Sequence, residues 1–236
     1  SVYGREKSRH NGGVALQWGM RTLLYRRGVH LRLVNVGATP VIEHNQELGY
    51  PICAVCGQSV SPLSSIAQMD NFTRQHEDRC GRKPERLGFF ADVVADCLVM
   101  PECPNREEAY SLMETLRMGA TQVLDMHLED LQVLVIGHVD RDEVDAMLWD
   151  PMPGGSGLID QIRDHMAEVV TAGISLAQGC SGACDKSCVD CLQTFRNAYY
   201  HKHLNRHTAA RLLMECGSTV AELHSIPPQQ PIAQSP

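Results

Sequence analysis

The pattern of apolar and polar residues predicts strands and helices in alternation, most clearly in the second half of the chain. Apolar residues recur at helical spacing within 105–120, 158–173 and 206–215. Two shorter apolar segments, 131–136 and 143–149, flank a charged turn and predict a β-hairpin. Together these elements predict an α+β fold, in which a mostly antiparallel sheet is packed by helices.

The first third and the end of the chain have weaker patterns. Residues 14–26 carry apolar side chains at helical spacing, which predicts a short helix. Segments 30–36 and 87–100 are rich in valine, leucine or phenylalanine and predict strands. The last residues, 226–236, are rich in proline and glutamine, a composition typical of a tail that does not fold.

Four cysteines within twelve residues are the strongest chemical signal in the chain. Small and turn-forming residues separate them, so a chain that folds back on itself brings all four thiols to one ion. Zn²⁺ prefers thiolates and fills its shell with four ligands in structural sites, which leaves no open position for catalysis. Two local disulfides, or four free thiols, are the alternatives. The predicted ligands are Cys180, Cys184, Cys188 and Cys191.

A second cysteine pair predicts a second structural zinc. Cys53 and Cys56 are followed by a glycine, which lets the backbone of a zinc knuckle turn so that its amides face the thiolates. His76 and Cys80 are one helical turn apart and therefore share a face. The alternative is that the two knuckle cysteines are buried thiols and His76 is a surface residue.

These features divide the chain into four predicted parts. A basic linker or helical segment precedes a strand with a zinc finger of three cysteines and one histidine, followed by an α+β domain that ends in the four-cysteine site and by a disordered tail. No signal peptide or membrane span is evident, so we expect a cytoplasmic protein with reduced thiols. The predicted parts are 1–29, 30–86, 87–216 and 217–236.

Charge is distributed unevenly along a chain whose net charge is −7. Residues 1–33 carry seven lysines and arginines against one acid, whereas 125–150 carry eight acids against one arginine. This asymmetry favours separate surfaces for separate partners. The alternative is a basic terminus and an acidic hairpin that only contact solvent.

Residues 192–207 interleave basic and aromatic side chains without a single acid. This composition is typical of a surface that neutralises phosphates and stacks on bases, and the expected phosphate contacts are Arg196, Lys202 and Arg206. The alternative is that Phe195 and Tyr199, four residues apart, belong to the core.

A glycine-rich loop at the predicted strand-to-helix junction offers a further candidate for phosphate contact. The loop contains Gly154, Gly155 and Ser156, and backbone amides at a helix start favour an anion. The alternative is a tight turn in which Asp150 caps the local amides. No Walker A lysine follows the glycines, so nucleotide hydrolysis has no support here.

The C-terminal motifs together resemble a known family. The run 149–157, the four cysteines and the segment that follows them resemble the MrfA-associated zinc-binding domain, and the resemblance covers roughly 30–215. That domain occurs in superfamily-two DNA helicases and in the DrmB component of DISARM anti-phage systems. The resemblance implies an accessory module of a DNA-translocating or defence machine, with a zinc held by the four cysteines.

Three functions follow from these observations. The first is a zinc-binding accessory domain that contacts single- or double-stranded DNA and docks a helicase motor in cis or in trans. The second is an assembly scaffold that never touches DNA. The third is a metal-dependent nuclease using Asp140, Asp150, His201 and His203. Motor motifs are absent from this sequence, so we expect no enzyme activity. We also expect no membrane contact and no small-molecule substrate. The expected setting is either DNA repair or phage defence.

Overall fold

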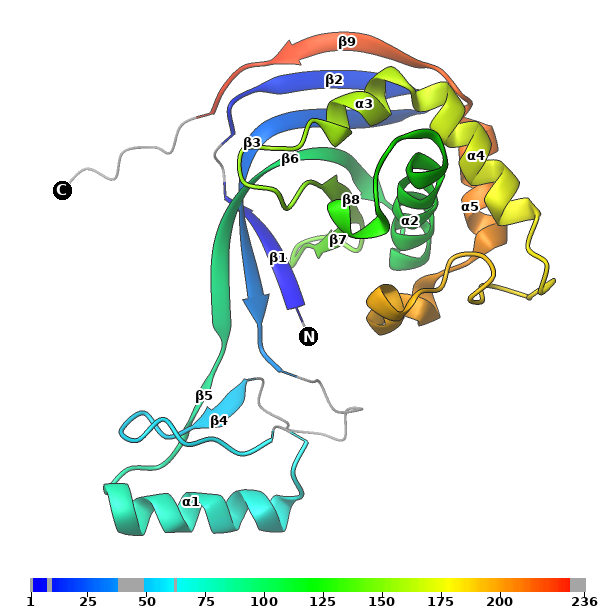
Figure 1. Cartoon of the computed structure of the whole chain (residues 1–236). Helices are drawn as coiled ribbons and strands as arrows, with labels where there is room; N and C mark the ends of the chain where they lie inside the picture. The colour runs from blue at the N-terminus through cyan, green and yellow to red at the C-terminus, as the bar shows by residue number, and fades with distance from the viewer. Residues whose placement is uncertain (1, 8–9, 38–48, 62, 230–236) are drawn as a thin grey trace. The chain divides into compact units, whose positions relative to one another are not determined.

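A computed structural model of the chain describes residues 2–7, 10–37, 49–61 and 63–229 (Figure 1). The chain forms two compact units, one made of 1–5 with 32–92 and the other of 6–31 with 93–236. Both units are discontinuous in sequence, unlike the four predicted parts, because strands from distant segments pair in one sheet. Among the described helices, none is both long and apolar enough to cross a membrane.

The main sheet has the strand order β7-β8-β6-β3-β2-β9, and β1 pairs with β3. The pairs β2–β3, β2–β9, β6–β8 and β7–β8 are antiparallel. The predicted α+β class with an antiparallel sheet is therefore confirmed, and so is the predicted hairpin. The strands are β1 (Val2–Lys7), β2 (Gly13–Trp18), β3 (Arg21–Asn35), β6 (Phe89–Cys103), β7 (Gln132–Gly137), β8 (Val144–Trp149) and β9 (Val220–Ile226).

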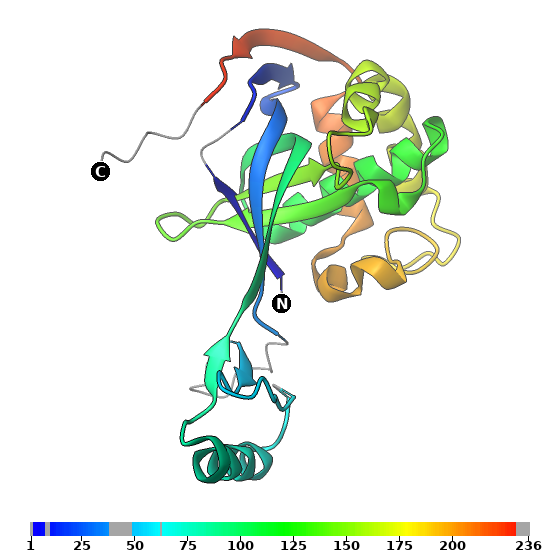
Figure 2. The ribbon, with the colours of Figure 1, turned by 60° about the vertical axis from the view of Figure 1, so that its left-hand side comes forward.

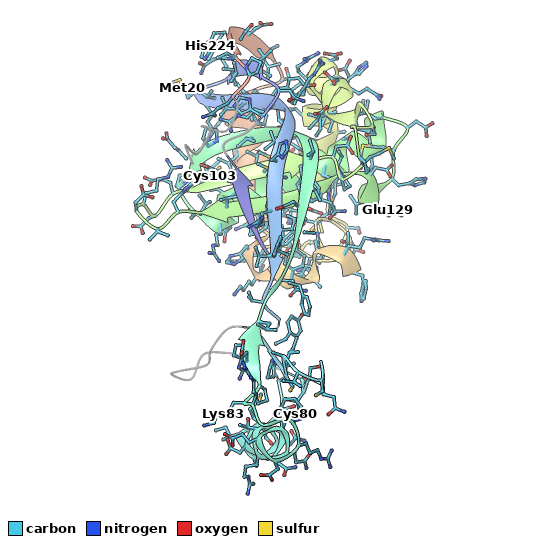
Figure 3. The ribbon with its side chains drawn as sticks, turned by 90° about the vertical axis from the view of Figure 1, so that its left-hand side faces the viewer. Met20, Cys80, Lys83, Cys103, Glu129 and His224 are labelled. Carbon is cyan, nitrogen blue, oxygen red and sulfur yellow. The ribbon has the colours of Figure 1, made fainter. Side chains whose placement is uncertain are left out.

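The helix predicted over 14–26 is wrong, because this segment forms the hairpin of β2 and β3. Leu16 lies opposite Leu23 in the register, and both are buried. Apolar residues seven positions apart thus meet across a turn instead of along a helix face. Met20, at the turn, is exposed and is labelled in Figure 3.

The prediction that 217–236 does not fold is wrong in its first half. Val220–Ile226 forms β9, which pairs with β2 at one end of the sheet. Its side chains are mostly exposed, so backbone hydrogen bonds hold the strand in the sheet. A strand with exposed side chains has no strong hydrophobic pattern by which the sequence could predict it. Residues 230–236 lie outside the described part of the chain.

Helix α2 is the central helix of the larger unit. It packs against β7 and β8, and helices α4 and α5 pack against it (Figures 1 and 2). Asn105 caps α2 by accepting a hydrogen bond from the Glu108 amide at 2.9 Å, as its sequence position predicts. The helices of this unit are α2 (Arg106–Val123), α3 (Leu158–Asp164), α4 (Met166–Gln178) and α5 (Arg206–Cys216).

A close approach between α2 and α4 depends on glycine. A Cβ atom added to Gly119 would lie 2.5 Å from the carbonyl oxygen of Val169 and 2.9 Å from the amide nitrogen of Gly173. Any larger side chain at either glycine would push the two helices apart. This contact positions the C-terminal end of α4, from which the four-cysteine loop starts.

In its described residues, the smaller unit contains one helix and a two-stranded sheet, besides the ends of β1, β3 and β6. Strand β4 (Tyr50–Ile52) pairs antiparallel with β5 (Glu85–Leu87). Helix α1 (Ile66–Cys80) begins at a Ser65 capping box and buries one side chain, His76. Figure 3 shows Cys80 at the C-terminal end of this helix.

Candidate metal centres

The four cysteines of the 180–191 loop converge as predicted. The Sγ atom of Cys180 lies 3.4 Å from that of Cys188 and 3.7 Å from that of Cys184. Cys191 completes the group, with its Sγ atom 3.7 Å from Cys184 and 4.0 Å from Cys188. Four sulfurs at about 2.3 Å from a tetrahedral zinc are separated by roughly 3.8 Å. The sulfur positions therefore fit zinc.

The loop backbone is shaped to hold these thiols. The Cys188 amide donates a hydrogen bond to the Cys191 sulfur at 3.2 Å. A Cβ atom added to Gly182 would lie 3.2 Å from the Cys188 sulfur, so this position accepts only glycine without displacement. A hydrogen bond from the Cys184 backbone lowers the pKa of Cys180 to about 7, whereas burial raises the pKa of Cys191 to about 12. All four cysteines would bind a metal ion as thiolates.

Arg206 braces this loop instead of facing solvent. Its Nε atom donates to the Cys184 carbonyl at 2.9 Å, and its Nη1 atom donates to the Ala177 carbonyl at 3.0 Å. Its backbone amide donates to the Lys186 carbonyl at 2.7 Å. Arg206 therefore ties the cysteine loop to the ends of α4 and α5. The expected phosphate contact at Arg206 is not supported, because its guanidinium is used within the fold.

Replacing Arg206 with alanine is expected to lower the free energy of unfolding by about 1.5–3 kcal/mol, because two carbonyls lose a charged donor. Urea unfolding followed by circular dichroism would measure the change. Arg211→Ala is the matched control, since Arg211 makes exposed ion pairs with Glu108 and Glu215 that are worth at most about 1 kcal/mol. Equal losses in the two variants would contradict the bracing role.

The segment after the loop is held by a buried polar network that the sequence pattern does not reveal. Glu114, from the middle of α2, is fully buried. Its carboxylate accepts hydrogen bonds from Asn197 at 2.8 Å, Tyr200 at 2.7 Å and Arg117 at 2.5 Å. Arg117 also donates to the Leu131 carbonyl. In the sequence, the one signal for this network is the pair Glu114 and Arg117, two opposite charges three residues apart in an otherwise apolar stretch of α2.

This network turns two aromatic residues outward. Asn197 and Tyr200 point into the core from the 3₁₀ helix η2 (Phe195–His203). Phe195 is 96% exposed and Tyr199 is 67% exposed. The alternative that both belong to the core is therefore wrong, because the inward positions of η2 are taken by residues that bind Glu114.

Three of the four ligands predicted for the second zinc also converge. The thiols of Cys53, Cys56 and Cys80 lie within 4.8 Å of one another. His76 is not part of this group, and its ring is hydrogen-bonded on both sides. Its Nδ1 atom lies 2.9 Å from the Phe72 carbonyl and its Nε2 atom 3.0 Å from Oε1 of Gln58. The alternative that His76 is a surface residue is wrong, because it is buried.

The glycine-rich loop forms the tight turn given above as the alternative. The buried carboxylate of Asp150 accepts hydrogen bonds from the amide of Met152 and from both the amide and the hydroxyl of Ser156. The Asp96 carboxylate also lies close, 3.0 Å from where a Cβ atom of Gly155 would be. Two carboxylates beside these amides disfavour a phosphate, so nucleic-acid contact by Gly154, Gly155 and Ser156 is not supported.

The residues considered for a nuclease do not form a metal site. In the described ranges, the groups of possible metal ligands are the two cysteine clusters. Asp150 is used by its own loop, His201 bonds the Thr194 carbonyl and Asn197, and His203 stacks on Tyr110. These side chains are engaged in local structure and do not surround one open position.

Three arginines of the basic N-terminal stretch form ion pairs within the fold. Arg21 bonds Glu108 at 2.9 Å, and Arg27 bonds Asp160 at 3.0 Å. Arg32 makes a two-point contact with Asp92. These arginines are therefore less available for contact with a phosphate. Directly after the cysteine loop, Arg196 and Lys202 are exposed cations, and Arg196 forms a solvent-exposed ion pair with Glu129 at 3.7 Å.

A group of four thiols that leaves no open position, here within an α+β fold, is typical of structural zinc-binding domains. Residues 112–192 match the model of the MZB family, the MrfA Zn-binding domain. The match begins in α2 and ends one residue after Cys191. It confirms the resemblance given by the C-terminal motifs.

Two known proteins extend the comparison. Druantia protein DruE from Escherichia coli (strain UMEA 4076-1) is 30% identical over an alignment that covers 70% of this chain and 10% of DruE. The DUF1998 helicase MrfA, solved bound to DNA, has a similar fold with a TM-score of 0.52 and 13% identity, covering 91% of this chain and 25% of that chain. The chain thus spans about a tenth and a quarter of these longer proteins.

Proposed function

We propose that this chain is a zinc-stabilised accessory domain that contacts nucleic acid and docks a helicase motor. The observation that carries the proposal is the direct junction between the four-thiol site and an acid-free segment that exposes Arg196 and Lys202. The zinc would hold this segment in place, and the exposed cations would contact phosphates. The similar fold of a helicase that was solved bound to DNA supports the proposal.

The motor lies outside this chain in our proposal. The two relatives are several times longer than this chain, which supports a motor either in the same polypeptide or in a separate subunit.

Charge reversal tests the nucleic-acid contact. The double variant Arg196→Glu with Lys202→Glu is expected to weaken DNA binding at least 10-fold at low salt and to flatten the slope of log K against log salt by about 0.7–0.9 per lost contact. Fluorescence anisotropy at several salt concentrations would measure both. The control is Arg211→Glu on α5. If the double variant binds as the wild type does, these residues are not the contact.

An assembly scaffold is the second candidate. The turn between β7 and β8 carries Asp140, Asp142 and Glu143, and an acidic turn of this kind favours a protein partner over nucleic acid. Failure of the chain to bind any DNA at low salt, together with co-purification with the motor after nuclease treatment, would establish the scaffold and exclude the first proposal.

We further propose that Cys53, Cys56 and Cys80 hold a second zinc, with His76 as the fourth ligand. Both ring partners of His76 are acceptor oxygens, and the neutral ring donates to one of them; in the tautomer whose Nδ1 atom donates to the Phe72 carbonyl, Nε2 bears the lone pair that would bind a metal. A histidine that donates one ring nitrogen to a carbonyl is typical of zinc ligands. The Gln58 side chain, beside the knuckle, would yield its place at Nε2 to the metal.

Metal analysis tests the second zinc. The wild type is expected to contain two zinc ions per chain, and Cys80→Ser is expected to contain one. His76→Ala should bind the second zinc 10-fold or more weakly, whereas Gln58→Ala should retain it. A wild-type zinc content of one, or full retention in Cys80→Ser, would contradict the site.

A further inference from the structure

We propose that Phe195 and Tyr199 form a platform on which unpaired bases of single-stranded nucleic acid stack. This inference rests on the proposed nucleic-acid function and adds to it the form of the ligand. Both rings belong to η2, directly after the four-cysteine loop. Figures 1 and 2 show η2 (orange) next to that loop (yellow).

The exposure of Phe195 is the first observation that calls for a ligand. An isolated phenylalanine that is 96% exposed gains nothing from the fold of this unit. Tyr199 packs edge-on against Tyr200, with ring centroids 4.7 Å apart, and still exposes most of its surface. Exposed aromatic faces suit base stacking, because every base has a π face.

The second observation is that the platform is held rigidly. The capping box of Thr194 and Asn197 fixes the start of η2, with hydrogen bonds of 2.8 Å and 3.3 Å. Asn197 and Tyr200 are in turn bound to the buried Glu114. An aromatic residue presented on a fixed backbone loses little conformational entropy when a base binds to it.

The third observation is the charge around the rings. Arg196 and Lys202 are exposed on the same segment, which has no acid over 192–207. An acid from another element, Glu129 in the 3₁₀ helix η1 (Leu128–Asp130), places its carboxylate 3.7 Å from Arg196. It is labelled at the surface in Figure 3. Phosphate would compete with this exposed ion pair, which is weak in water.

These observations favour single strands over a duplex or a protein. Bases within a duplex are stacked on each other and cannot lie on a side chain, whereas unpaired bases can. A protein partner would be favoured by a wide apolar surface, but the other exposed residues of η2 are Arg196, Ala198 and Lys202. Cations beside two aromatic faces complement a strand whose phosphates and bases alternate.

The test compares a labelled single strand with a duplex of the same sequence, using the complete zinc-loaded chain. Phe195→Ala and Phe195→Leu are expected to bind the single strand roughly 5- to 150-fold more weakly, whereas Phe195→Trp retains affinity. Binding of the duplex should change less than twofold in all three. Met20→Ala is the control, because Met20 is an equally exposed apolar residue in the β2–β3 turn.

The outcomes separate this inference from the proposed function. If the wild type binds neither the single strand nor the duplex, the proposed nucleic-acid function and the base-stacking platform are both excluded. If it binds DNA and Phe195→Ala matches Met20→Ala, the platform alone is excluded. Equal affinities of Phe195→Leu and Phe195→Trp would show an apolar contact instead of stacking, and equal losses on single strand and duplex would also overturn the inference. Glu129→Gln should strengthen binding of both ligands, and a weakening would contradict the charge argument.

Discussion

Cys188→Ser is expected to abolish zinc binding at the four-cysteine loop and to unfold the larger unit around it. A structural zinc contributes binding free energy directly to folding, about 10–16 kcal/mol in zinc-finger peptides. A typical domain is stable by about 5–15 kcal/mol. Because Cys191 and Leu192 belong to the same buried cluster as α2 and α5, an unanchored loop removes part of the core, and the loss spreads beyond residues 180–191.

The measurements for this variant are zinc content and thermal unfolding, compared with a chelator-treated wild type. Cys216→Ala is the matched control, because Cys216 is a buried thiol that belongs to neither cysteine cluster. It should keep the full zinc content and lose only the stability of a small cavity, about 1 kcal/mol. A Cys188→Ser protein with an unchanged melting temperature would show that this site does not support the fold.

Glu114→Ala has the second-largest expected effect, a loss of about 3–5 kcal/mol in the free energy of unfolding. The substitution leaves the buried guanidinium of Arg117 without its partner, and breaking one side of a buried ion pair costs this amount. It also removes the acceptor for Asn197 and Tyr200. We therefore expect η2 to lose its fixed position, so single-strand affinity should fall with stability.

A double-mutant cycle separates the ion pair from the rest of the network. Glu114→Leu combined with Arg117→Met should be less destabilising than the sum of the two single variants, because no unpaired charge stays buried. Urea unfolding of the four proteins gives the coupling free energy. A coupling near zero would show that the pair contributes no more than two independent polar residues.

Local sequence signals predicted the cysteine loop and the helices within 105–120 and 206–215, whereas the helix expected over 158–173 is divided into α3 and α4 at His165. Cys180, Cys184, Cys188 and Cys191 are close in sequence, so their convergence needs only a short folded loop. The caps at Asn105 and Asn205 act on amides two or three residues away. Such features depend on neighbours along the chain and can be inferred without knowledge of the fold.

Predictions that depended on long-range contacts were less successful. Segment 14–26 has helical spacing, yet it pairs within a hairpin and with β9 from the other end of the chain. Arg206 has the charge of a phosphate contact, but its guanidinium reaches the carbonyls of Cys184 and Ala177. In both cases the decisive partner lies outside the local pattern.

The sequence by itself determined the chemistry of this protein, namely a thiol-rich chain with four clustered cysteines suited to a structural metal and an acid-free aromatic segment directly after them. Only the tertiary structure decided which of these side chains are available to a partner. The buried carboxylate of Glu114 takes Asn197 and Tyr200 inward and leaves Phe195 and Tyr199 exposed. Burial depends on contacts between residues more than 80 positions apart, and spacing along the chain does not contain that information.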